Sequence, residues 1–193
     1  MKKILTITTA LLILTTLAQA EHPYKKHHTN PHGGFGGFGM KFTNVGNDQQ
    51  ILFGGSGAGF LSDNFYWGGG GYGTVSNSNT IDIQDGAVTR KTTLDMGYGG
   101  FMVGYVKPLN QYIKWETQLL LGFGGFTLTD NNFQSDQNFF VAEPSVNFYV
   151  SPTEWLHIGL GAGYRFANLS NGFVDNSIFN KPSFNLNFNF GNM

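Results

Sequence analysis

The chain contains no cysteine and few charged residues. Only 12% of its 193 residues are charged, and none is a cysteine. Disulfides therefore cannot stabilise the protein, so its stability must come from packing or from a surrounding bilayer. The absence of cysteine also excludes a lipid anchor of the kind that bacterial lipoproteins carry.

A strong positive charge is also lacking. The 11 basic residues fall to 9 once Lys2 and Lys3 are removed with the leader described next, against 12 acidic residues. This balance argues against nucleic acid as a partner. Glycine-rich segments such as 122–125 are not followed by a helical pattern, so no helix N-terminus is available to bind a phosphate.

The first twenty residues have the three parts of an export signal. Residues 1–3 are basic at two positions, residues 4–17 are apolar with threonines, and residues 18–20 read Ala-Gln-Ala. This pattern predicts cleavage before Glu21. The alternative is a membrane anchor, but an apolar segment of fourteen residues is shorter than the roughly 20 that a spanning helix needs.

Glycine and aromatic residues are abundant and are interleaved along the chain. There are 28 glycines, and 16% of the residues are aromatic. Segment 184–190 alternates large apolar and asparagine side chains, which gives a β-strand one apolar and one polar face. Seven further stretches predict strands, and most reach the roughly 9–11 residues of a tilted membrane strand. The eight expected strands are about 35–45, 50–60, 65–75, 93–106, 114–128, 139–150, 156–167 and 183–191.

The connections between these strands alternate in length. Three are short, namely 61–64, 107–113 and 151–154. Three others are longer and rich in Asn, Asp, Ser and Thr, namely 76–92, 129–138 and 168–182. The first connection on that side, 46–49, is itself short. Short turns at one rim and long polar loops at the other are typical of small outer-membrane barrels, in which the short turns face the periplasm.

All three tryptophans follow short turns. Trp67, Trp115 and Trp155 each lie at the start of a strand. Amphipathic rings collect where lipid headgroups meet hydrocarbon, so these residues predict a periplasmic aromatic girdle. The alternative is a set of core aromatics that happen to lie near turns. The tyrosines beside the same turns are assigned to the same girdle, and they are Tyr66, Tyr112 and Tyr149.

Alternation alone leaves open which face points inward. A soluble lipocalin-like barrel places its apolar face inside, and a membrane barrel does the reverse. The four strands from 114 onward already carry more large apolar side chains than half of an eight-stranded interior can hold. The apolar face is therefore expected to contact lipid. Strand glycines such as Gly159 are expected to leave room for a neighbouring aromatic ring.

The opposite face is expected to line a polar lumen. Strands 139–150 and 156–167 form a hairpin that brings Glu143 and Arg165 within about one residue pair of each other. Because a buried charge must be paired, we predict a Glu143–Arg165 contact that Glu116 is able to join. A structural role is favoured over catalysis or transport. The predicted lumen network consists of Glu116, Glu143, His157, Arg165, Asn185, Asn187 and Asn189.

Four of the five histidines precede the first strand. A short His-rich tract is able to bind a metal weakly, which makes His27, His28 and His32 candidate ligands. A flexible lead-in without metal is the favoured interpretation. The barrel histidine, His157, has no Ser or Asp at a spacing that suggests a triad. No catalytic residue and no cofactor are expected.

In these respects the chain resembles the eight-stranded outer-membrane β-barrel superfamily, which includes the OmpA-type transmembrane domain, OmpX and OmpW. The resemblance implies an all-β, eight-stranded antiparallel up-and-down transmembrane β-barrel over 35–193, preceded by a signal peptide (1–20) and a flexible His-rich periplasmic lead-in (21–34). It also implies a porin-like cell-envelope protein of the Gram-negative outer membrane, with lipid and the barrel-assembly machinery as partners.

Three functions remain open at this point. The first is a non-enzymatic barrel, expected to be a monomer, with a largely plugged polar lumen and a structural or surface-interaction role. The second is a small pore or a carrier for small or apolar molecules. The third is a soluble periplasmic ligand-binding barrel of the lipocalin type.

Overall fold

The structure is a computed structural model that describes residues 33–193 apart from 47, 76–79, 86–87, 131–132 and 170–175. The predicted signal peptide and the lead-in up to residue 32 lie outside these residues. The described part contains no helix long and apolar enough to cross a bilayer. Its elements are β1 (Gly34–Val45), β2 (Asp48–Phe60), β3 (Phe65–Thr74), β4 (Thr80–Asp85), β5 (Val88–Pro108), β6 (Ile113–Asp130), β7 (Phe133–Val150), β8 (Leu156–Leu169), the 3-10 turn η1 (Asn176–Ile178) and β9 (Lys181–Gly191).

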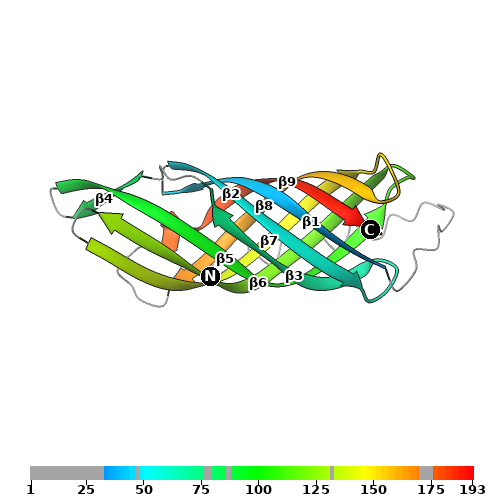
Figure 1. The fold of residues 1–193 in the computed structure, drawn as a ribbon, viewed down its shortest axis with the longest axis horizontal. Coiled ribbons are helices and arrows are strands. Elements are labelled where there is room, and N and C mark those ends of the chain that lie inside the picture. Colours follow the sequence, from blue (N-terminus) through cyan, green and yellow to red (C-terminus); the bar gives the residue numbers. More distant parts are fainter. Residues whose placement is uncertain (1–32, 47, 76–79, 86–87, 131–132, 170–175) are drawn as a thin grey trace, which may run out of the picture.

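Eight of the strands close into a barrel. Successive barrel strands pair antiparallel, and the first strand, β1, pairs with the last, β9. β3 pairs with β5 and not with β4, and this pairing completes the ring. Figure 1 shows these strands tilted around one long axis. The predicted eight-stranded antiparallel up-and-down barrel is confirmed.

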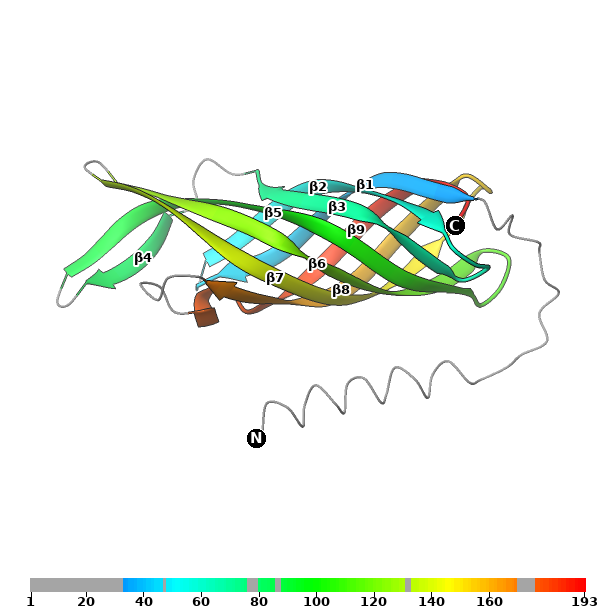
Figure 2. The same cartoon turned by 90° about the horizontal axis from the view of Figure 1, so that it is seen from below.

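The prediction that 76–92 and 129–138 are long polar loops is wrong in part. Thr80–Asp85 forms β4, which pairs with the first residues of β5, and β6 and β7 stay paired as far as Asp130 and Phe133. Figure 2 shows β4 projecting beyond the barrel at the end opposite the C-terminal residues. The segment Thr80-Ile81-Asp82-Ile83 alternates polar and apolar residues, as a β-strand does. It is too short to span a membrane, so it was not predicted as a barrel strand.

The barrel has two rims of different character. The turns 61–64, 109–112 and 151–155 lie at one rim, together with the start of β1 and the end of β9. We call this the short-turn rim. The connections β1–β2, β3–β5, β6–β7 and β8–β9 lie at the other, which we call the long-loop rim.

Side chains alternate between the two faces of the barrel wall as the sequence predicts. In β9, Phe184 is 67% exposed, whereas the neighbouring Asn185 is 5% exposed. Asn187 and Asn189 are buried in the same way. In β9 the large apolar side chains are therefore on the outer surface, and the asparagines point into the interior, which we call the lumen.

Two strand glycines accommodate large lumen side chains. Gly104 and Gly159 are paired directly opposite Tyr66 and Tyr149 in the neighbouring strands. A Cβ at either glycine would overlap the tyrosine ring that lies across it. The expected combination of a bare glycine backbone with an overlying aromatic ring is therefore present.

Candidate functional site

The centre of the lumen is occupied by a buried ion pair. Lys41 Nζ of β1 lies 2.7 Å from Glu143 Oε1 of β7, and the two side chains are 7% and 1% exposed. Tyr98 Oη donates a hydrogen bond of 2.5 Å to Glu143 Oε2, and Ser183 Oγ donates one of 3.2 Å to Oε1. Lys41 Nζ also lies 3.7 Å from the centre of the Tyr72 ring, a favourable cation–π position. Five strands therefore contribute to one pair of charges and its surroundings.

The predicted Glu143–Arg165 ion pair is wrong. Arg165 does lie opposite Glu143 in the β7–β8 hairpin, but its Nε donates to the carbonyl of Phe179 at 3.0 Å and its Nη2 to that of Asn44 at 3.3 Å. The guanidinium therefore points to the long-loop rim. Glu143 is satisfied by Lys41 instead, which is 102 residues away in sequence. Only the closure of β1 onto β9 brings this lysine into reach.

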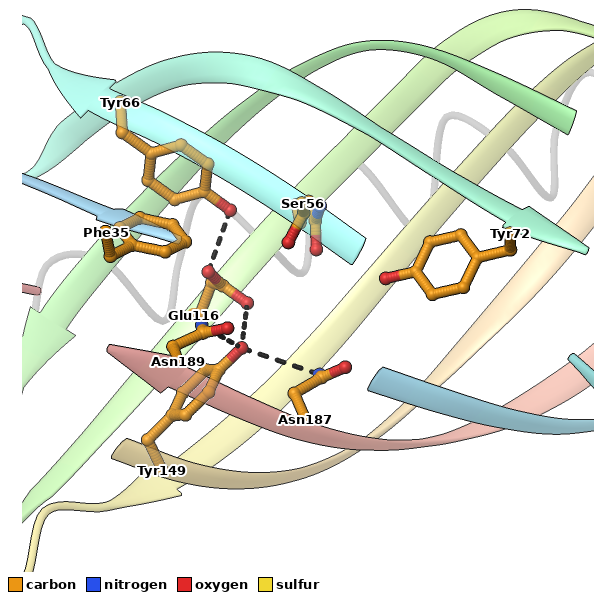
Figure 3. Close-up of a pocket in the computed structure, with 9 residues that line it drawn as sticks. Phe35, Ser56, Tyr66, Tyr72, Glu116, Tyr149, Asn187 and Asn189 are labelled. Carbon is orange, nitrogen blue, oxygen red and sulfur yellow. Dashed lines mark hydrogen bonds between the residues drawn. The ribbon is translucent and has the colours of Figure 1, made fainter. Parts of the chain in front are cut away.

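Glu116 forms a second cluster nearer the short-turn rim, and it does not join the ion pair. Tyr66 Oη donates to its Oε1 at 2.8 Å, while Asn147 Nδ2 and Tyr149 Oη donate to its Oε2 at 2.7 and 3.1 Å. These contacts are drawn in part in Figure 3. All three donors are neutral, and no cation within the described part of the chain forms an ion pair with this carboxylate.

The three asparagines of β9 are buried in the lumen and link it to β7. Asn185 Nδ2 and Asn187 Nδ2 lie 3.3 and 3.4 Å from Asn147 Oδ1. Asn189 Nδ2 donates to Tyr149 Oη at 3.2 Å. The structure thus brings the asparagines together with Glu116, but not with Arg165.

His157 lies at the short-turn rim, opposite Asn189 in the β8–β9 pairing, and its ring is bonded to other partners than the predicted lumen residues. Its Nδ1 is 2.7 Å from Ser151 Oγ, and its Nε2 is 3.0 Å from the carbonyl oxygen of Gly191. A proton on Nε2 satisfies the carbonyl, so that the Ser151 hydroxyl donates to Nδ1. The sequence did not reveal this pair, because Ser151 lies in the turn before β8 rather than on the strand.

The Ser151–His157 contact resembles the nucleophile–base pair of a hydrolase. In a hydrolase triad a carboxylate binds the second ring nitrogen of the histidine, whereas here that nitrogen contacts the backbone carbonyl of Gly191. Both residues are also buried, His157 completely. The contact therefore fastens the end of β9 to the β7–β8 turn.

An aromatic cluster lies across the lumen toward the long-loop rim. Phe179 follows η1 and is completely buried, with its ring centre 4.7 Å from that of Phe126 and 5.8 Å from that of Phe139. The amide of Gly46 donates to the carbonyl of Ile178 at 2.9 Å, which ties η1 to the β1–β2 connection. Large side chains thus occupy this end of the interior.

The short-turn rim is also occupied by large side chains. Phe35 packs edge-on against Tyr66, with ring centres 5.1 Å apart, and Tyr149 and Met193 are buried in the same cluster. Lys114 Nζ donates to the backbone oxygen of Met193. Sequence reasoning assigned no role to Phe35 or Met193.

The aromatic residues near the short turns divide between the two faces. Trp67 and Trp155 are more than half exposed on the outer surface, and Trp115 is half-buried there. The assignment of Tyr66 and Tyr149 to the girdle is wrong, because both are 2% exposed and point into the lumen. Both neighbours of each tyrosine along its strand face outward. Because side chains alternate along a strand, each tyrosine therefore points inward.

The candidate metal ligands His27, His28 and His32 lie outside the described residues. Within 33–193, gaps excepted, no three side chains of His, Cys, Asp or Glu gather in a way that could hold a metal ion.

Several solved structures have the same fold. The N-terminal β-barrel domain of OprF from Pseudomonas aeruginosa matches with a TM-score of 0.56 and 12% identity, over 83% of this chain and 97% of that one. Neisserial surface protein A matches with a TM-score of 0.56 and 9% identity, over 84% and 96%. The outer membrane protein OprG from P. aeruginosa matches with a TM-score of 0.54 and 13% identity, over 83% and 96%.

No protein-family model and no curated protein sequence matches the chain. At these identities the structural matches define the fold class alone, which is that of the eight-stranded outer-membrane barrels.

Proposed function

We propose that the chain is a non-enzymatic integral outer-membrane β-barrel protein with a polar, largely plugged lumen and polar loops at the cell surface. Its role is structural or that of a surface-interaction protein. It is exported by the signal peptide, inserted by the barrel-assembly machinery, and resident in outer-membrane lipid as a monomer.

The outward apolar face is the observation that carries this proposal. Side chains that are 42–73% exposed surround the barrel on many of its strands, for example Phe53, Phe101, Phe123, Phe140, Leu160 and Phe184. Soluble monomers rarely expose a continuous apolar surface of this extent. In a bilayer the same side chains contact lipid, and the rim tryptophans lie at the headgroups. A soluble lipocalin-like barrel would have the opposite arrangement.

The contents of the lumen favour a plugged barrel over a pore. The Lys41–Glu143 pair occupies its centre, the Phe179 cluster lies toward one rim and the Phe35 cluster toward the other. An eight-stranded barrel has an interior just wide enough for side chains to fill. Short turns face the periplasm in such proteins, so β4 and the ends of β5 to β7 would project from the cell surface.

The buried state of the Ser151–His157 pair supports a role without catalysis. A hydrolase needs its nucleophile in reach of the substrate, whereas Ser151 is 6% exposed.

Membrane fractionation tests the location. The protein is expected in the outer-membrane fraction, soluble only in detergent, and its gel migration is expected to change on boiling. Recovery as a detergent-free periplasmic protein would contradict the proposal. A planar-bilayer recording separates the plugged barrel, which gives no steady conductance, from the pore, which gives discrete long-lived steps.

A further inference from the structure

A small cavity lies in the lumen beside Glu116. It has a volume of about 10 Å³ and is lined by polar side chains that include Ser56, Tyr66, Tyr72 and Glu116 (Figure 3). A cavity of this size accommodates one particle about as large as a water molecule. The lining atoms come from separate strands of the wall, so the site exists only in the closed barrel.

The hydrogen bonds around Glu116 fit an ionised carboxylate. Asn147 Nδ2 is able only to donate, so Oε2 accepts from it. Tyr149 Oη accepts a hydrogen bond from Asn189 Nδ2, so its own proton points to Oε2 as well. Tyr66 Oη lies 2.8 Å from Oε1, where its proton is able to complete the set. The carboxylate is 1% exposed and has no cationic partner among the described residues. In its ionised form Glu116 therefore requires a counter-charge.

The Tyr72 hydroxyl is an independent sign of a ligand at the same place. Tyr72 is 8% exposed, and the structure shows no hydrogen-bond partner for its hydroxyl among the described residues. The ring lies on Lys41, and the oxygen points into the space bounded by Ser56 and the Glu116 cluster (Figure 3). Its lone pairs are therefore directed into the cavity without a donor to satisfy them.

We propose that the cavity binds one small monovalent cation of the Na⁺ type. Carboxylate and hydroxyl oxygens are the ligands that hard cations prefer. A single carboxylate balances a single positive charge, whereas protein sites for divalent ions generally combine several anionic ligands. A neutral water molecule would satisfy the hydroxyl oxygens but would leave an ionised Glu116 without a partner.

The sodium dependence of unfolding tests this site. The refolded protein in detergent micelles is unfolded with urea at increasing NaCl, and N-methyl-D-glucamine chloride keeps the ionic strength constant. A ligand that binds only the folded state stabilises it in proportion to the logarithm of its concentration above its dissociation constant. The urea midpoint is therefore expected to rise with Na⁺ for the wild-type protein, because the organic cation is too large for the cavity. Equal midpoints in the two salts would overturn the proposal.

Three variants locate the effect. Glu116→Gln is expected to abolish the sodium dependence, and Tyr72→Phe to weaken the apparent Na⁺ affinity about tenfold by removing one ligand. Glu154→Gln removes an exposed carboxylate from a short turn and is expected to retain the wild-type dependence. If Glu116→Gln does not fold, Tyr72→Phe and Glu154→Gln still decide the outcome. A sodium dependence that Tyr72→Phe leaves unchanged would contradict the site. A urea midpoint that changes with pH but not with Na⁺ would also contradict it, because Glu116 would then carry a proton.

Discussion

Removing Lys41 tests whether the central ion pair determines the stability of the lumen. Lys41→Met keeps most of the side-chain volume but leaves Glu143 without its cation. An exposed ion pair is worth at most about 1 kcal/mol. Here the two side chains are 7% and 1% exposed and their atoms are 2.7 Å apart. Removing one partner of such a buried pair costs about 3–5 kcal/mol, and the remaining donors Tyr98 and Ser183 place the expected cost near the lower end, about 3 kcal/mol.

The assay is urea unfolding in phospholipid vesicles, followed by tryptophan fluorescence. The double variant Lys41→Met/Glu143→Gln is the matched control, because it removes both charges and keeps an acceptor for the neighbouring hydroxyls. Its free energy of unfolding is expected to return most of the way to the wild-type value. A cost below about 1 kcal/mol for the single variant, or a double variant that is equally destabilised, would refute the reasoning.

The remaining predictions concern the wall and the long-loop rim. Leu160→Arg on the outer face should cost about 2–4 kcal/mol of unfolding free energy in vesicles if this position lies near the midplane. Leu61→Arg, at an equally exposed position in a short turn, should cost less than about 0.5 kcal/mol. Similar costs for the two variants would contradict lipid contact. Gly159→Ala should destabilise by about 1–3 kcal/mol because its Cβ collides with the overlying tyrosine ring, while Gly59→Ala, with open space at its Cβ, serves as the near-neutral control in the same unfolding assay. Phe179→Ala should cost about 3–5 kcal/mol. It should still give no steady conductance in a planar bilayer, because the Lys41–Glu143 pair and the Phe35 cluster continue to occupy the lumen, and conductance steps in this variant would contradict that arrangement.

The architecture was predictable because it depends on local periodicity. The alternation of β9 fixes which of its side chains share a face, and the difference in length between turns fixes which strand ends share a rim. The volume of the apolar side chains then decides which face points outward. None of these steps needs a contact between distant segments.

The lumen pairs were less predictable because they depend on barrel closure and on side-chain reach. The register of one hairpin correctly placed Arg165 opposite Glu143, but it did not show that the arginine turns toward the Phe179 carbonyl. Lys41 was missed although the sequence carried a signal. It lies between Met40 and Phe42, and Phe42 is outward-facing, so alternation turns the lysine inward.

A single-cysteine scan of β9 tests the central claim, that the apolar face contacts lipid and the polar face lines the lumen. Because the chain contains no cysteine, each substitution provides a unique attachment point for a spin label. In vesicles, labels at Leu186→Cys and Phe188→Cys are expected to be accessible to lipid-dissolved oxygen, and a label at Asn187→Cys is expected to be shielded from it. An inverted pattern, or equal accessibility at all three positions, would contradict the proposed orientation of the barrel wall.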